Sequence, residues 1–130
     1  MNKTIIIPGN PVAAHRPRFS RRSGRAYDGQ KQARDCMTWH VVAGWGDIEP
    51  IDGPVEVDVT FHMTIPKSAS KKRRLALQGQ PCLKHVDTDN LQKILYDSML
   101  GVCFNDDSQI WAVNARKVWD EDGRTVVIVR

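Results

Sequence analysis

The chain has 130 residues, of which 41% are hydrophobic, 26% charged and 7% aromatic. This composition is typical of a globular protein and excludes a disordered or fibrous chain. A chain of this length buries enough surface for one core but not for two, so we expect a single domain over residues 1–130.

The sequence predicts a protein of the reducing cytoplasm. No apolar run approaches the roughly 20 residues that a membrane-spanning helix needs, and the N-terminus has no signal-peptide core or cleavage site. The three cysteines, Cys36, Cys82 and Cys103, have long and unequal spacings that match neither a disulfide framework nor a paired zinc motif. We therefore expect no membrane partner.

Charged residues are concentrated in alternating blocks along the chain. The net charge of +4 divides into +6 over residues 1–40, −5 over 41–66, +6 over 67–84 and −3 over 85–130. Basic blocks separated from acidic ones favour a surface that binds a polyanion beside a site that gathers carboxylates. The alternative is a pair of solvated loops that happen to be basic.

The N-terminal third of the chain predicts a strand, a basic loop and a helix. Residues 4–8 form the expected strand, which ends at the turn-forming residues 8–11. Residues 15–25 place five arginines among Pro, Ser and Gly, which predicts a mobile basic loop. Asp28 is positioned to cap a helix that ends before Gly44.

The spacing of apolar residues predicts which face of this helix is buried. Trp39 and Trp45 are interpreted as packing residues. The inward face is expected to carry Ala33, Cys36, Met37, His40 as a core histidine, and Val41.

The middle of the chain predicts a half-buried strand and a second basic segment. Apolar and polar residues alternate without a break over residues 55–65, which is typical of a strand with one buried face. Residues 67–74 are a basic loop or short helix.

The C-terminal half predicts a helix followed by two strands. Residues 89–100 form a helix with Leu91, Ile94, Leu95 and Met99 inward, Gln92 completing a capping box and Gly101 at its end. Residues 110–119 and 125–129 are expected to form antiparallel strands joined by a turn, with a further short strand near 102–104. The order β-α-β-α-β-β predicts an α+β fold of two layers, with helices on one face of a mixed or antiparallel sheet.

Two acidic pairs in this half are candidates for a metal site. Asp87 and Asp89 lie where extended chain enters a helix and can point the same way. Asp106 and Asp107 follow on the turn into the next strand, and hairpin geometry can return them to the first pair. Converging carboxylates repel each other unless a cation lies between them, and hard oxygen ligands suit Mg²⁺ or Mn²⁺. The equally weighted alternative is a helix cap and a turn.

Other metal and cofactor sites are excluded by spacing. An EF-hand starting at Asp87 would need an oxygen ligand, a glycine and a glutamate where Leu91, Gln92 and Ser98 stand. The histidines and cysteines are scattered without zinc-ligand spacing. Neither a glycine-rich phosphate loop nor a nucleophile elbow is present, so no organic cofactor is expected.

The acidic segments resemble the RusA family of Holliday-junction resolvases. The family pattern is an Asp-x-Asp-Asn-Leu-x-Lys segment, an Asp in the helix and a downstream Asp-Asp-Ser/Ala-Gln. The matching residues are 87–93, Asp97, Gly101, 106–110 and Lys117. The early residues 7–11 and 16–19 are similar to the N-terminal pattern of the phage and prophage branch.

The resemblance implies a role for each matching residue. It implies that Asp87, Asp89 and Asp107 bind Mg²⁺, with Mn²⁺ as a substitute, that Asp106 is a weaker ligand candidate, and that Lys93 is the essential active-site lysine. The family often has a basic residue just before the first Asp, where this chain has His85 and Val86, so Lys84 is a candidate for that role.

The resemblance also implies a homodimer that makes paired nicks in a four-way DNA junction and leaves 5′-phosphates, in recombination and repair. Backbone phosphates are expected to contact the basic residues Arg16, Arg18, Arg21, Arg22, Arg25, Lys71, Lys72, Arg73, Arg74 and Lys84. A non-catalytic branched-DNA-binding protein and a metal-dependent nuclease for other branched DNA remain the alternatives.

Overall fold

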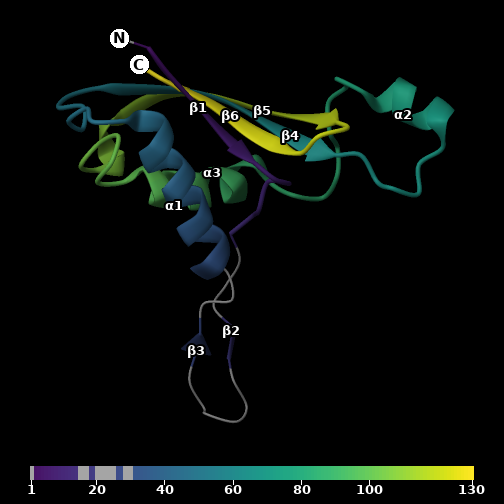
Figure 1. Cartoon of the computed structure of the whole chain (residues 1–130), viewed down its shortest axis with the longest axis horizontal. Coiled ribbons are helices and arrows are strands. Elements are labelled where there is room, and N and C mark those ends of the chain that lie inside the picture. The colour runs from purple at the N-terminus through teal and green to yellow at the C-terminus, as the bar shows by residue number, and fades with distance from the viewer. Residues whose placement is uncertain (1, 15–17, 20–25, 28–30) are drawn as a thin grey trace.

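The computed structural model describes residues 2–14, 18–19, 26–27 and 31–130. It has the predicted α+β fold, with helices on one side of a mixed four-stranded sheet (Figure 1). The elements are β1 (Lys3–Pro8), β2 (Arg18–Phe19), β3 (Ala26–Tyr27), α1 (Lys31–Trp45), β4 (Val55–Thr64), α2 (Lys71–Leu77), α3 (Thr88–Met99), a 3₁₀ turn η1 (Asp107–Gln109), β5 (Ile110–Asp120) and β6 (Arg124–Val129).

The sheet has the strand order β1-β6-β4-β5, in which β4 and β5 are parallel and the other neighbours antiparallel. The predicted hairpin of the last two strands is wrong, because β4 lies between them and pairs with both. The turn 121–123 therefore crosses the end of β4 and spans two strand spacings, about 10 Å. Phe104 makes only isolated bridges to Ile51 and Leu100, so residues 102–104 are not a strand.

The core lies between this sheet and the helices α1 and α3. Alternate residues of β4 from Val55 to Met63, and then Ile65, are at most 2% exposed, as the alternation predicts. The predicted inward residues of α3 are fully buried. In Figure 1, α1 and α3 lie on the same side of the sheet, and α2 lies beyond the ends of β4 and β5. No helix among the described residues is long and apolar enough to cross a membrane.

α1 buries only part of the face that was predicted. Met37, Val41 and Trp45 are its buried residues, whereas Cys36 is exposed and Trp39 is 67% exposed. His40 is only partly buried and lies edge-on to the Trp39 ring, with ring centroids 5.0 Å apart, so it is not a core histidine. The face is rotated because α1 packs on β1 as well as on α3.

Gly44 lies inside α1 and does not end it. A Cβ atom at Gly44 would lie 3.0 Å from a side-chain carbon of Ile5, so glycine allows α1 to approach β1 closely. The helix ends at Gly46, whose positive φ of 80° reverses the chain and whose N–H donates to the Val42 carbonyl. The expected cap, Asp28, lies outside the described residues.

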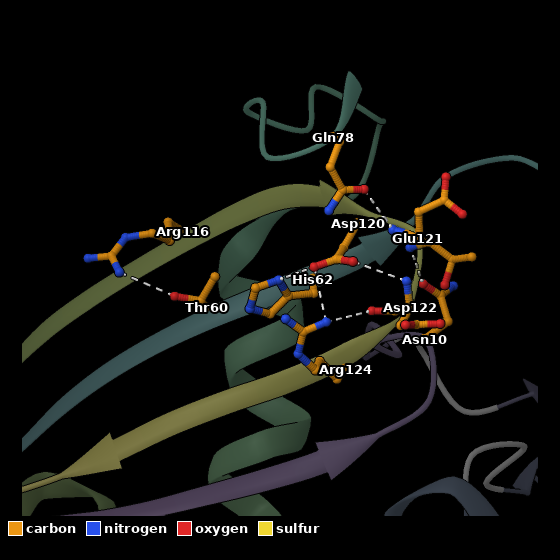
Figure 2. Close-up of polar contacts among 10 residues, drawn as sticks. Asn10, Thr60, His62, Gln78, Arg116, Asp120, Glu121, Asp122 and Arg124 are labelled. Atoms are coloured by element: carbon orange, nitrogen blue, oxygen red, sulfur yellow. Dashed lines mark hydrogen bonds and ion pairs between the residues drawn. The ribbon is translucent and has the colours of Figure 1, made fainter. Parts of the chain in front are cut away.

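The crossing from β5 to β6 is held by polar contacts, which we call the turn cluster and define as His62, Asp120 and Arg124 (Figure 2). Asp120 Oδ2 lies 3.1 Å from His62 Nδ1 and accepts a hydrogen bond of 3.0 Å from Arg124. Burial opposes ionisation of Asp120, but the N–H of Asp122, the Gln78 amide and Arg124 outweigh it and lower its pKa to about 2. Burial and the charge of Arg124 lower the pKa of His62, against the opposing effect of Asp120.

Candidate active site

An open groove of about 510 Å³ lies at the N-terminal end of α3. The segment 82–87, the first residues of α3 and Lys117 of β5 line it, and both Asp87 and Asp89 are among the lining residues. Asp87 is the residue before the helix and has an extended backbone, but its side chain makes no capping hydrogen bond. Both residues thus line one groove, and Asp87 is not a side-chain helix cap.

Lys93 lies one helical turn beyond Asp89 on the exposed side of α3. Its Nζ is 4.0 Å from Asp89 Oδ2 and 3.5 Å from Asn90 Oδ1, and the Lys93 and Asp89 side chains are about two-thirds exposed. A contact this open leaves the ammonium group available to an incoming phosphate. The predicted capping role of Gln92 is wrong, because its Oε1 accepts from the Tyr96 hydroxyl instead.

The second acidic pair lies at the other end of α3. The chain leaves α3 at Leu100, and η1 follows at Asp107–Gln109. η1 leads into β5 at Ile110, and Lys117, which lines the groove, lies seven residues or about 23 Å further along this strand, so the prediction that this pair returns to Asp87 and Asp89 is not met within one chain. Across residues 2–14, 18–19, 26–27 and 31–130, no three His, Cys, Asp or Glu side chains are grouped so that they could hold a metal ion.

The two acidic side chains of this second pair differ in their environment. Asp106 accepts a hydrogen bond from the Ser108 N–H and caps η1, and these hydrogen bonds lower its pKa. Asp107 is exposed on the 3₁₀ turn itself. The carboxylate of Asp106 is therefore used locally, and Asp107 is the better candidate ligand.

The residues in the groove fit a small hard cation. Mg²⁺ keeps several waters and is commonly bound through one or two carboxylates together with substrate phosphates. Asp87 and Asp89 supply that number of carboxylates at the N-terminus of a helix, where the helix dipole favours negative charge.

The predicted phosphate-contacting residues fall into three groups. Lys71, Lys72 and Arg73 are exposed on α2, and Lys84 is exposed in the groove. Arg74 is occupied, because its guanidinium donates to the carbonyls of Ala69 and Pro66. Arg18 is described only by its backbone, in β2. The other predicted residues, Arg16, Arg21, Arg22 and Arg25, lie outside the described residues.

Two further residues, Gln109 and Lys117, hold the acidic segments in place. Gln109 accepts from the N–H groups of Asn105 and Asp106 and donates to the carbonyls of Ile51 and Gly53. It forms a capping box with Asp106, a signal present in the sequence as an acidic residue followed three positions later by Gln. Lys117 donates to the carbonyls of Lys84 and Val86, and no local pattern indicates that contact.

Two comparisons with known proteins give a match over most of the chain. The family model described as endodeoxyribonuclease RusA matches residues 8–130. An uncharacterized protein of Bacillus subtilis (strain 168), YqaN, is 32% identical over 134 residues, which cover 97% of this chain and 94% of that protein.

Proposed function

This chain belongs to the RusA endodeoxyribonuclease family, and from that premise we propose that it is a divalent-metal-dependent nuclease that resolves four-way DNA junctions by paired nicks. The observation that carries the proposal is the groove at the start of α3, where Asp87 and Asp89 lie together and Lys93 follows one turn later. As a recombination nuclease of the prophage type, it acts on DNA in the cytoplasm.

The chemistry proposed is hydrolysis of one phosphodiester in each of two strands. A divalent cation, when bound, polarises the phosphate and lowers the pKa of a coordinated water. Asp87 and Asp89 bind this cation, and the ammonium group of Lys93 contacts the scissile phosphate and offsets its developing charge. The water oxygen bonds to phosphorus as the bond to the 3′ oxygen breaks, which leaves a 5′-phosphate and a 3′-hydroxyl.

A second copy of the chain supplies Asp107 in this proposal. β5 is an edge strand, and the segment 79–82 covers only its end, through hydrogen bonds to Lys117 and Trp119. The first part of β5 carries Trp111 and Val113, which are 68% and 45% exposed. A long edge strand with exposed apolar side chains favours pairing with another strand.

Antiparallel pairing of two β5 strands brings the two acidic segments together. If the two-fold axis passes near Val113, residue 111 of one copy lies opposite residue 115 of the other, and the start of the partner's β5 reaches the end that the segment 79–82 covers. Asp107 of the partner subunit then lies beside the groove that Lys117 lines with Asp87 and Asp89. One homodimer thereby holds two composite sites, one for each strand to be cut.

The basic residues of α2 and the groove provide the DNA-binding surface. Lys71, Lys72 and Arg73 are exposed, and among the described residues their side chains have no hydrogen-bond or ion-pair partner. Together with Lys84 and the arginines of residues 16–25, they neutralise backbone phosphates away from the cut.

Mixing two inactive variants tests the composite site. Asp87→Asn and Asp107→Asn are each expected to lose at least about 10²-fold in cleavage of a synthetic four-way junction in Mg²⁺. Equal mixing should restore nicking to about a quarter of wild type, because half the dimers are mixed and each has one intact site.

Four other outcomes would contradict parts of the proposal. No restoration means that Asp107 acts within its own chain or not at all. Full wild-type cleavage in excess chelator removes the metal assignment. Tight junction binding by a wild-type protein that never cuts supports the non-catalytic alternative, and equal cleavage of flaps and junctions supports a broader branched-DNA nuclease.

A further inference from the structure

Lys117 is a cation on the helix-covered side of the sheet. It pairs in register with Phe61 of β4, which is 1% exposed, and paired residues of neighbouring strands project to the same face. Its Nζ donates to the carbonyl of Lys84 at 2.9 Å and to that of Val86 at 2.5 Å. The side chain thus crosses from β5 to the segment that leads into α3.

The segment held in this way is the wall of the groove. The Cys82 N–H donates to the Lys117 carbonyl, and the Val86 N–H donates to the Lys84 carbonyl and closes a tight turn. The main chain of Lys117 therefore fixes the start of the segment, and its ammonium group fixes the end. Hydrogen bonds from a charged donor are stronger than those between neutral groups.

Asp87 follows directly after Val86, and its carboxylate makes no capping hydrogen bond that would orient it from the helix. The direction of the Asp87 side chain consequently depends on the main chain before it. An ammonium group has three donors, and two of them are used on the carbonyls of Lys84 and Val86. Lys117 acts through the main chain and not as a metal ligand.

We propose that Lys117 is a positioning residue, whose ammonium group fixes the turn at residues 84–86 so that Asp87 and Asp89 bind one divalent cation together. This inference rests on the proposed function of the groove. It differs from the role of Lys93, which contacts the substrate phosphate.

Metal binding by purified dimer, followed by the electron paramagnetic resonance signal of free Mn²⁺, tests this role without cleavage. Lys117→Met is expected to weaken Mn²⁺ binding by about 10–100-fold, the usual effect of removing a group that orients a metal ligand. Lys117→Arg, which keeps the charge and the donors, should restore most of the affinity. Arg116→Met is the matched control, because Arg116 is the neighbouring cation on the opposite face of β5 and contacts Thr60 (Figure 2).

Cleavage and backbone exchange supply two further readouts. Lys117→Met should lower kcat for a four-way junction and leave KM within about twofold, and it should speed amide hydrogen exchange over residues 84–89. If Lys117→Met does not fold, Lys117→Gln is used with the same expectations for affinity and exchange. Wild-type Mn²⁺ affinity in the folded variant would overturn the inference.

A reference variant separates this inference from the proposed function. Asp87→Asn combined with Asp89→Asn should abolish Mn²⁺ binding if the groove is the metal site. If that double variant binds Mn²⁺ as wild type does, the proposed function fails at this site. If it loses binding while Lys117→Met and Lys117→Arg both retain it, only the role of Lys117 is wrong.

Discussion

Gln109 shows how one uncharged side chain holds the second acidic segment. Its amide makes four hydrogen bonds, two as acceptor from the loop before η1 and two as donor to carbonyls of residues 51 and 53. Asp107 lies two residues away on the same 3₁₀ turn, so the placement of its carboxylate depends on this amide.

Gln109→Ala is therefore expected to lower the free energy of unfolding by about 2 kcal/mol, since hydrogen bonds each contribute about 0.5–1.5 kcal/mol net. Gln92→Ala is the matched control, because it removes one hydrogen bond, to Tyr96, and should cost less than about 1 kcal/mol. Urea unfolding of both variants measures the difference. Equal losses would show that the four hydrogen bonds of Gln109 together contribute no more stability than the single hydrogen bond of Gln92.

At the scale of elements, the turn between β5 and β6 is the least expected feature. It passes over the end of β4, and Gly123 has no room for a side chain because a Cβ atom would lie 2.8 Å from the Asn10 Cα. The turn cluster joins all three strands, through His62 of β4, Asp120 of β5 and Arg124 of β6. The contribution of the turn cluster to folding stability depends on the protonation of His62 and Asp120.

Stability should fall as the pH drops below about 6.5. The pKa of His62 is lower in the folded protein than in the unfolded chain. Between the folded pKa and 6.5, the unfolded chain therefore binds more protons than the folded protein, and a falling pH favours unfolding. The lowered pKa of Asp120, about 2, adds a second loss below about pH 4. In thermal melts at different pH values, His62→Gln should reduce the fall in melting temperature just below pH 6.5. His40→Gln, which lies outside the turn cluster, should leave that fall unchanged. An unchanged pH profile for His62→Gln would contradict this.

At the scale of the whole molecule, the proposed dimer depends on the first part of β5. Trp111→Lys with Val113→Lys should convert a dimer of about twice 14.7 kDa into a folded monomer, because charges on an edge strand oppose pairing. Paired nicking should be lost with the dimer. Trp39→Lys is the matched control, since Trp39 on α1 is 67% exposed, almost as much as Trp111. Sedimentation measures both, and a double variant that stays dimeric would place the interface elsewhere.

Residues close together in sequence were sufficient to predict most of the elements and the acidic motif. The alternation over residues 55–65 and the helical spacing of Leu91, Ile94, Leu95 and Met99 each depend on one local period, so burial followed as expected. Asp87, Asp89 and Lys93 lie within two helical turns, so the groove that holds Asp87 and Asp89 and the contact of Asp89 with Lys93 both depend on nearby residues.

Tertiary structure decided the features that depend on distant residues. β4 separates β5 from β6, Gly44 contacts β1 instead of ending α1, and Lys117 holds a turn some 30 residues before it. The length of β5 between η1 and Lys117 keeps Asp107 away from Asp87 within one chain, although a loop pattern alone permits their contact. These contacts depend on how whole faces of helices and strands pack against each other. That packing involves residues far apart in the sequence, so a local sequence pattern cannot predict it.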